Sequence, residues 1–296
     1  MAKFSLSECF FSLEGEAQFT GTPTVYARFA RCNLKCPLFN NHEKLMTPNG
    51  YADLGFDPKA FNSLGELPVI ERGCDSQYSV NPAFSHMWRT VSTDDVISEL
   101  EGLLPRGWVF PSGIPVILSL TGGEPTLLWK SLPELILHDR LRDVRHILVE
   151  TNCTVPFKDS FLEAIHEWMS LDTRRIWTWS NSPKLSSSGE DRDSAIKPAV
   201  ALMQSSVLTA FPNRVNQYFK FVVDGSQADI DEVRECMAVY HAAGVPTDTP
   251  VWLMPAACTT QQQAQIAQKV AEQCMSEGYL FSYRLQNALW ENQIGT

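Results

Sequence analysis

From residue 90 onward, short apolar runs alternate with stretches of helical spacing, and this alternation constrains the fold more than any other feature. The apolar runs predict strands at 116–120, 146–150, 175–179, 218–223, 251–254 and 279–285. The stretches of helical spacing predict helices at 92–105, 127–138, 159–168, 230–243 and 261–276. Repeated strand–helix units favour parallel pairing with right-handed crossovers. We therefore predict an α/β fold, with an incomplete or complete barrel as first choice and an open doubly wound sheet as second.

A strand and a long irregular segment precede this region. Residues 24–30 alternate between two sides, and we interpret them as the first strand, with Arg28 on the opposite side from Val25, Ala27 and Phe29. Residues 37–90 have no periodicity and are rich in Asn, Gly, Pro and Ser, which is typical of a long loop. Aromatic and apolar residues within this segment indicate that it packs against the rest of the chain.

The composition limits the number of domains and the class of partner. A chain of 296 residues with 44% hydrophobic content can bury a large core, and we expect one domain over residues 1–296. The net charge is -10 and the pI is about 5.1, so no basic field attracts a phosphate backbone. We therefore expect a small-molecule partner and no direct binding of nucleic acid.

The cysteines and the N-terminal residues predict a cytoplasmic location. Eight cysteines are spread thinly, unlike the disulfide framework of a small secreted protein. Polar residues interrupt every apolar run in residues 1–19, so we expect no secretion signal. No stretch approaches the ~20 apolar residues that span a bilayer. Free thiolates that can bind metal are then expected.

Three of the cysteines form an unusual pattern. Cys32 and Cys36 are separated by three residues, and a loop that binds an iron–sulfur cluster would place a third cysteine at position 39, where Phe39 stands. We interpret residues 37–73 as an insertion that moves the third thiol to Cys74. Lengthening the closed loop from ~3 to ~38 residues costs roughly 2 kcal/mol, which cluster ligation can offset. Three thiolates leave one iron of a four-iron cluster open to another ligand.

A glycine-rich turn follows the predicted strand 116–120. Its sequence, Thr-Gly-Gly-Glu-Pro at 121–125, lies where the active sites of α/β barrels are found. The two glycines allow a ligand close to the backbone, and Glu124 can accept hydrogen bonds from an ammonium group. An ordinary tight turn is the alternative interpretation of this motif by itself.

Together, these motifs resemble the radical S-adenosylmethionine enzymes, and more closely the 7-carboxy-7-deazaguanine synthase family. The segments that match are 11–16, 28–36, 74–76, 121–125, 150–152, 182–184, 220–224 and 284–290, and they span almost the whole chain. The resemblance implies a partial (β/α) barrel of the radical S-adenosylmethionine type, with the loop-rich insertion after the first strand.

The resemblance also implies a role for individual residues. Cys32, Cys36 and Cys74 would bind a [4Fe-4S] cluster whose fourth iron is chelated by S-adenosylmethionine. Ser76 would bind Mg²⁺ where the family usually has a threonine. Asp75, Gly123, Glu124, Ser182, Pro183 and Lys184 would hold S-adenosylmethionine. The substrate would contact Leu13, Glu14, Gly15, Glu16, Arg28 and Thr121. Arg28 would clamp a carboxylate, with an internal salt bridge or a surface position as the alternative.

The family reaction is the conversion of 6-carboxy-5,6,7,8-tetrahydropterin to 7-carboxy-7-deazaguanine, with ring contraction and loss of ammonia. It starts from a 5'-deoxyadenosyl radical and belongs to deazapurine biosynthesis of the queuosine type. The resemblance further implies an electron donor such as flavodoxin or ferredoxin and a possible homodimer.

Two substitutions and two alternatives qualify the resemblance. Glu14 replaces a usual glutamine, and Cys153 replaces a usual glycine. Another radical enzyme, such as a glycyl-radical activase, would share the three cysteines and the turn at 121–125. A non-enzymatic zinc-binding protein could use three cysteines and a fourth ligand, but it leaves residues 121–125 and 182–184 unexplained.

Overall fold

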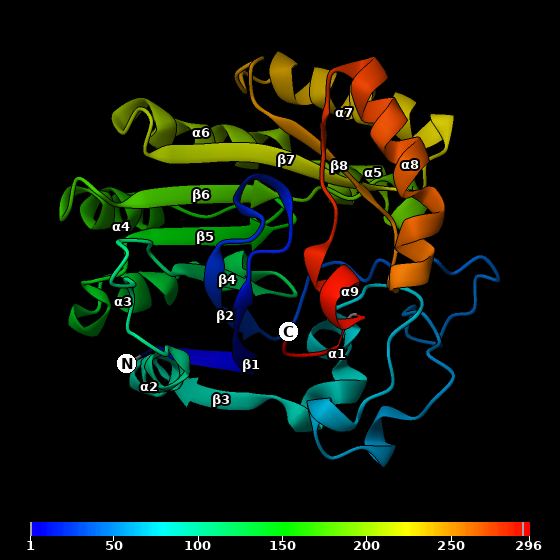
Figure 1. The fold of residues 1–296 in the computed structure, drawn as a ribbon. Coiled ribbons are helices and arrows are strands. Elements are labelled where there is room, and N and C mark those ends of the chain that lie inside the picture. Colours follow the sequence, from blue (N-terminus) through cyan, green and yellow to red (C-terminus); the bar gives the residue numbers. More distant parts are fainter. Residues whose placement is uncertain (1, 292) are drawn as a thin grey trace.

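One open sheet organises the fold in the computed structural model, which describes residues 2–291 and 293–296 (Figure 1). Within these residues the sheet has nine strands in the order β3-β1-β2-β4-β5-β6-β7-β8-β9. The strands are β1 (Lys3–Leu13), β2 (Pro23–Phe29), β3 (Arg89–Ser92), β4 (Ile117–Gly122), β5 (His146–Thr151), β6 (Ile176–Asn181), β7 (Val215–Val223), β8 (Val251–Pro255) and β9 (Leu280–Phe281). Neighbours from β2 to β9 are parallel, whereas β1 is antiparallel to both β2 and β3. The prediction of an α/β fold is confirmed, and the sheet is not closed into a complete barrel.

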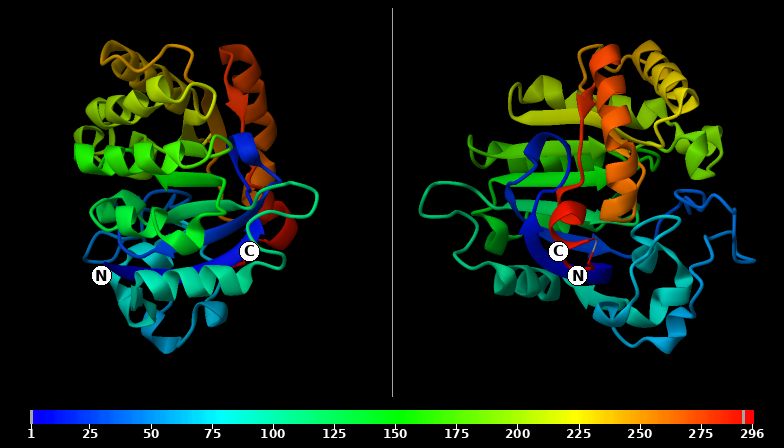
Figure 2. Two further views of the ribbon diagram at one scale, coloured as in Figure 1. Left: turned by 90° about the vertical axis from the view of Figure 1, so that its left-hand side faces the viewer. Right: turned by 45° about the vertical axis from the view of Figure 1, so that its right-hand side comes forward.

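Helices follow most of the parallel strands. The α-helices are α1 (Gln77–Val80), α2 (Thr93–Leu103), α3 (Leu132–Ile136), α4 (Asp159–Ser170), α5 (Arg192–Ala195), α6 (Pro198–Ala210), α7 (Gln227–Ala242), α8 (Thr260–Glu277) and α9 (Leu285–Trp290). Contacts join α2 to α3, α3 to α4, α4 to α6 and α6 to α7, so these helices form one layer on a single face of the sheet (Figure 2). Every helix of residues 2–291 and 293–296 falls short of the length and apolar character that a bilayer span needs.

Local sequence signals fix the ends of the longer helices. Ser92 accepts from the backbone of Asp95, whose side chain accepts from the backbone of Ser92, and this capping box begins α2 as predicted. Thr259 and Gln262 form a second capping box at the start of α8. Gly278 ends α8 in the left-handed region at φ 74°, where a side chain would be strained.

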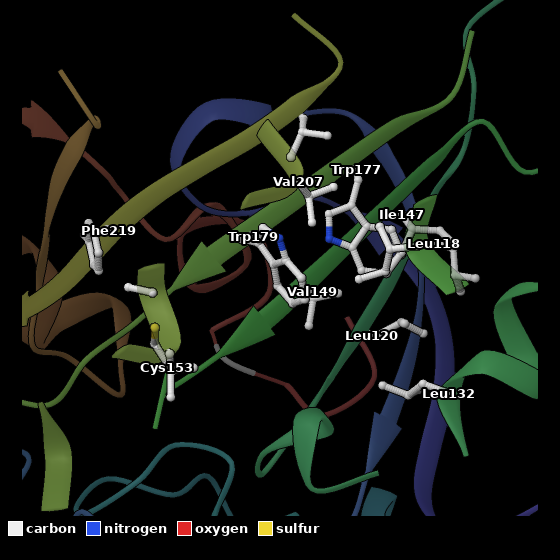
Figure 3. Packing of buried hydrophobic residues seen from close by; sticks show 14 of the residues in the cluster. Leu118, Leu120, Leu132, Ile147, Val149, Cys153, Trp177, Trp179, Val207 and Phe219 are labelled. Atoms are coloured by element: carbon white, nitrogen blue, oxygen red, sulfur yellow. The ribbon is translucent and has the colours of Figure 1, made fainter. Parts of the chain in front are cut away.

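The face of the sheet that meets the helix layer is apolar. On β6, Trp177 and Trp179 point to this face with ring centroids 5.3 Å apart, and Phe161 of α4 packs edge-on against both. Neighbouring strands continue the same row, as Figure 3 shows, with Leu118, Leu120, Ile147, Val149 and Phe219. Strand periodicity places every second residue on this face, so the residues between them point to the other one.

The other face is polar although it is buried. The side chains that alternate with the apolar row include Tyr26, Arg28, Ser119, Thr121, Thr178, Ser180 and Lys220. Because the parallel strands share one direction, their polar side chains are brought together near the carboxyl ends of the strands.

Several predicted boundaries are wrong. Residues 24–30 correspond to β2 and not to the first strand, because β1 precedes them in the chain. The irregular segment therefore follows the second strand. Only Leu280–Phe281 of the predicted strand 279–285 is extended in the sheet. Pro133, which has no N–H to donate, lies in the first turn of α3, so residues 127–138 form a 3₁₀ turn and a short helix.

The irregular segment has its own small apolar cluster, as predicted from its aromatic content. It contains the 3₁₀ turns η2 (Pro58–Ala60), η3 (Leu64–Glu66) and η4 (Pro82–Met87), with a single bridge between Met46 and Ala52. Ile70, Tyr78 and Phe84 are buried at the centre of this cluster. The residues packed around them are Leu54, Phe56, Leu64, Leu67, Met87, Trp88 and Ile294.

Candidate active site

The polar face of the sheet lines a cavity near the carboxyl ends of the parallel strands, where α/β proteins place their active sites. The predicted site residues that line it are Glu14, Glu16, Arg28, Cys32, Cys36, Cys74, Asp75, Ser76, Thr121, Gly123, Ser182 and Lys184. The remaining predicted site residues, Leu13, Gly15, Glu124 and Pro183, are not among the lining residues. Segments distant in the sequence therefore meet at one site.

The three cysteines of the split pattern lie on this cavity. The insertion returns to the position where the third cysteine was expected, because the backbone N–H of Gly73 donates to the carbonyl oxygen of Phe39 at 2.6 Å. Cys74, the next residue, thus enters the cavity beside the turn that holds Cys32 and Cys36. Glu190 fixes this turn by accepting from the backbone N–H groups of Lys35 at 2.7 Å and Cys36 at 2.6 Å.

The environment of the three thiols suits a metal cluster. Burial raises the pKa of Cys36 well above its ordinary value, the charge of Lys184 opposes this rise, and the charges of Cys74 and Cys32 add to it. Burial and the charge of Glu124 raise the pKa of Cys32 to about 12. A bound cation is what keeps such thiols deprotonated. Two donors already point at the sulfur of Cys32: the N–H of Leu34 at 3.4 Å and the amide of Asn152 at 3.6 Å.

The same side chains do not form a ready-made site for a single metal ion. Among residues 2–291 and 293–296, no group of three or more His, Cys, Asp or Glu side chains is placed to hold one metal ion. The case for a cluster therefore depends on the shared cavity, the return of the chain at Phe39 and the donors around Cys32.

The glycine-rich turn packs directly on the cysteine turn. The N–H of Gly123 donates to the carbonyl of Phe29 at 3.1 Å, and the N–H of Glu124 donates to the carbonyl of Arg31 at 2.9 Å. A Cβ atom on Gly123 would lie 2.1 Å from the carbonyl oxygen of Arg31 and 3.0 Å from the Cβ atom of Cys32. This close approach explains why glycine is needed at position 123.

Glu124 is occupied by protein donors. Its carboxylate accepts from the hydroxyl of Thr126 at 2.6 Å, the hydroxyl of Thr151 at 2.8 Å and the N–H of Asn152 at 2.6 Å. In this arrangement it ties the turn after β4 to the end of β5. The predicted contact between Glu124 and an ammonium group stays a prediction.

Ser182 and Lys184 lie on the cavity beyond β6. The N–H of Ser182 donates to the carbonyl of Thr151 at 2.7 Å, which joins the ends of β5 and β6. The Lys184 ammonium donates to the hydroxyl of Ser182 at 2.8 Å and to its carbonyl oxygen at 2.7 Å. Within the described residues Lys184 forms no ion pair, and its positive charge lowers the pKa of Asp75 and of the three cysteines on the cavity.

Arg28 is held in a fixed position on β2. It pairs with Glu8 through its Nε atom at 3.0 Å, so the internal salt bridge given as the alternative does form. Its Nη1 atom donates to the hydroxyl of Ser76 at 3.0 Å, and the rings of Phe10 and Tyr78 lie 5.5 and 5.7 Å from the guanidinium. Because a guanidinium has five N–H groups, others remain for an anion in the cavity.

A buried charge network connects the segments around the cavity. Arg284 pairs with Glu16 at 2.8 Å and with Asp75 at 2.7 Å, and Lys220 pairs with the other oxygen of Glu16. Burial alone raises the pKa of Glu16, but the charges of Lys220 and Arg284 lower it to about 2. Arg284 likewise lowers the pKa of Asp75 against the effect of burial. Glu16 and Asp75 are therefore ionised at neutral pH.

Sequence reasoning gave no role to three residues that the fold brings to the cavity. Glu150 accepts from the Thr121 hydroxyl at 2.8 Å and faces the centre of the polar surface. Lys220 and Arg284 neutralise Glu16. Glu150 and Arg284 stand at or near the ends of predicted strands, and Lys220 is a charged residue inside one; a charged residue in an otherwise apolar strand was the available signal. Their ion pairs join residues more than 200 positions apart in sequence, and spacing alone cannot reveal them.

Leu13 and Gly15 pack against the C-terminal segment. The carbonyl of Leu13 accepts from the Gln286 amide at 2.9 Å, and the carbonyl of Gly15 accepts from the N–H of Leu285 at 2.9 Å. A Cβ atom on Gly15 would overlap the Gln286 side chain. Leu13 and Gly15 therefore contact the cavity-lining residue Gln286 from outside the lining.

Comparison with known proteins gives consistent relatives. A 7-carboxy-7-deazaguanine synthase from Halobacterium salinarum is 27% identical over 97% of this chain and 90% of its own length. One from Rhodopirellula baltica is 26% identical over 98% of this chain and 88% of its own length. A crystal structure of QueE from Escherichia coli aligns with 96% of this chain and 94% of its own at 18% identity, with a TM-score of 0.48. No family model matches the chain.

The fold and the site define an α/β enzyme with a cysteine-lined cavity beside the ends of parallel strands. The near-full-length relatives all carry one name. Over nearly its whole length this chain is similar to 7-carboxy-7-deazaguanine synthases, at 23–27% identity.

Proposed function

We propose that this enzyme converts 6-carboxy-5,6,7,8-tetrahydropterin to 7-carboxy-7-deazaguanine with loss of ammonia. The observation that carries the proposal is the convergence of the three cysteines with the buried cations and carboxylates of the polar strand face in one cavity. Near-full-length similarity to relatives with the corresponding name supports the same reaction.

We assign Cys32, Cys36 and Cys74 as ligands of a [4Fe-4S] cluster. When bound, the cluster and S-adenosylmethionine supply the 5'-deoxyadenosyl radical that starts the reaction. Gly122 and Gly123 line the cavity without side chains, so the cofactor can approach the backbone of the turn after β4. Ser182 and the positively charged Lys184 lie on the cavity and are suited to bind the polar groups of S-adenosylmethionine. The ionised Asp75 can accept a hydrogen bond from the same cofactor.

The substrate side of the cavity is assigned to the β2 end and its neighbours. Arg28, already oriented by Glu8 and two rings, has free N–H groups that bind the pterin carboxylate. Ser76 lies 3.0 Å from Arg28 and 3.2 Å from a carboxylate oxygen of Asp75, so a Mg²⁺ ion there would have oxygen ligands beside the bound carboxylate. Glu16 and Thr121 complete this side of the cavity.

The finer architecture and the partners belong to the same proposal. We interpret the open parallel sheet as a partial barrel of the radical S-adenosylmethionine type, in a single domain in which residues 37–73 are an insertion. A cytoplasmic location, a donor such as flavodoxin or ferredoxin, and a homodimer accompany the family function. Nucleic acid has no direct part in this reaction.

The test is product formation by the reconstituted enzyme under anaerobic conditions. Incubation with carboxytetrahydropterin, S-adenosylmethionine, Mg²⁺ and a reductant should yield 7-carboxy-7-deazaguanine, identified by mass. Omission of Mg²⁺ should slow the reaction, and omission of the reductant should abolish it.

Two results would argue for the alternatives. Cleavage of S-adenosylmethionine without deazaguanine product would favour an activase-like enzyme. A colourless protein that contains zinc and no iron after anaerobic purification would favour a zinc-binding protein.

A further inference from the structure

Two glutamates that are two positions apart face the same cavity in different electrostatic situations. Glu16 is paired with Lys220 and Arg284. Glu14 is 2% exposed, and within the described residues it forms no ion pair. The cation whose charge acts on Glu14, Lys220, is already paired with Glu16.

The groups that face Glu14 disfavour a negative charge on it. Burial contributes most to raising its pKa well above the ordinary value, followed by the charges of Glu150 and Glu16; the charge of Lys220 and the hydrogen bond that Glu14 accepts from the backbone N–H of Glu16 at 3.3 Å oppose this rise only in part. The phenols of Tyr26 and Tyr218 are also electrostatic neighbours of Glu14, and burial is the main cause that raises the pKa of both. The surrounding titratable groups are Glu16, Tyr26, Glu150, Tyr218 and Lys220.

Hydrogen-bond geometry accommodates the same state. The Tyr26 hydroxyl contacts three groups: the carbonyl of Leu13 at 3.0 Å, an oxygen of Glu14 at 3.3 Å and the amide nitrogen of Gln286 at 3.5 Å. A phenol has one proton to donate, and a backbone carbonyl can only accept. When Tyr26 donates to Leu13 over the shortest of the three distances, its oxygen accepts from Gln286. The contact with Glu14 is then a hydrogen bond only if Glu14 supplies the proton.

We propose that Glu14 acts as a neutral carboxylic acid whose hydroxyl and carbonyl oxygen recognise an uncharged lactam-type edge of the bound ring. A neutral carboxyl group has one donor and one acceptor side by side, as an amide has, and it matches a ring N–H next to a C=O. The inference rests on the proposed function for the identity of the ring, which is the pyrimidinone part of a pterin. Glu16, which is ionised, binds a different part of the ligand.

The protonation state is tested by infrared difference spectroscopy on the reconstituted holoenzyme at neutral pH. The spectrum of the parent minus that of Glu14→Gln should show the carbonyl stretch of a neutral carboxylic acid. The spectrum of the parent minus that of Glu16→Gln should instead show the bands of an ionised carboxylate. Loss of carboxylate bands alone in the Glu14→Gln difference would overturn the proposal, whether or not the enzyme forms the expected product.

A second variant tests the hydrogen bond between Glu14 and Tyr26. Tyr26→Phe should keep the neutral-acid band but move it to higher frequency, because the hydroxyl of Glu14 loses its hydrogen-bond acceptor. An unmoved band would contradict the geometry that we infer for Glu14 and Tyr26.

The functional consequence is a pH-dependent KM for the pterin. The pKa of Glu14 is raised, so its neutral form is complete at low pH and is lost as pH rises through the raised pKa. Above that pKa the neutral fraction falls about tenfold per pH unit, and the KM of the parent should rise with it. Glu14→Gln should lack this alkaline rise.

At neutral pH, Glu14→Leu should have a KM at least about tenfold above that of Glu14→Gln, because it presents no hydrogen-bonding group. Equal pH profiles in the parent and Glu14→Gln, with product still formed, would overturn the inference and leave the proposed function intact.

Discussion

At the scale of single residues, the assignment of the cluster ligands gives the sharpest prediction. Cys74→Ala should lose most of the cluster iron after reconstitution, because two thiolates hold a cluster much less firmly than three. Cys153→Ala should retain it, since Cys153 is fully buried in the main apolar core, outside the cavity lining. Iron and sulfide analysis with the visible absorption spectrum measures both. Equal iron content in Cys74→Ala and the parent would refute the ligand assignment.

The sequence predicted residues whose chemistry is explicit in a motif, and it missed those whose role depends on a distant partner. Cys74 was assigned as the third cysteine because Phe39 stands at the usual position of that cysteine. In the structure the chain does return to Phe39 at Gly73. Arg284 could not be assigned, because its pairs with Glu16 and Asp75 exist only after the sheet and the C-terminal segment come together.

At the scale of elements, the contact between the turn after β4 and the cysteine turn predicts the effect of a small substitution. Gly123→Ala should destabilise the protein by about 1–3 kcal/mol, because its Cβ atom would force the backbone of Arg31 away. It should also lower the cluster content, since the displaced backbone leads directly into Cys32. Denaturant unfolding and iron analysis measure the two effects.

The matched control is Gly102→Ala in α2, where nothing lies within 4 Å of the added Cβ atom. Alanine is favoured over glycine by at most about 1 kcal/mol in a helix, and Gly102 lies in the last turn of α2, so this variant should be at least as stable as the parent with unchanged iron content. Equal behaviour of the two variants would show that the turn after β4 does not position the cysteines.

The elements that were predicted best are those with a strong local signal. The strand at 146–150 and the helices at 159–168 and 261–276 agree with β5, α4 and α8 to within a few residues. The missed elements lack such a signal. In β1 the alternation of Ser5 and Ser7 with apolar residues covers only its first half, and Cys9–Phe11 breaks it. The helix α6 is apolar around much of its surface, so it shows little periodicity.

At the scale of the whole molecule, two separate apolar clusters stabilise two different parts of the protein. The main core joins the sheet to its helix layer, whereas the small cluster of Ile70, Tyr78 and Phe84 belongs to the irregular segment. The segment carrying Cys74 can therefore open without unfolding the sheet, since local opening costs only the contacts that it breaks. The third thiol depends on the smaller of the two clusters.

The two clusters predict separable effects for two phenylalanine-to-alanine substitutions. Phe84→Ala removes a fully buried ring from the small cluster, so it should speed tryptic cleavage at the exposed Lys44 and Lys59 and reduce the cluster iron. Its denaturation midpoint should stay near that of the parent, because the main core is untouched. Phe161→Ala should lower the free energy of unfolding by about 3–5 kcal/mol and leave native-state cleavage at Lys59 unchanged. A shared loss of global stability in the two variants would mean that the irregular segment and the sheet unfold as one unit, and the site would then owe its third ligand to the whole fold.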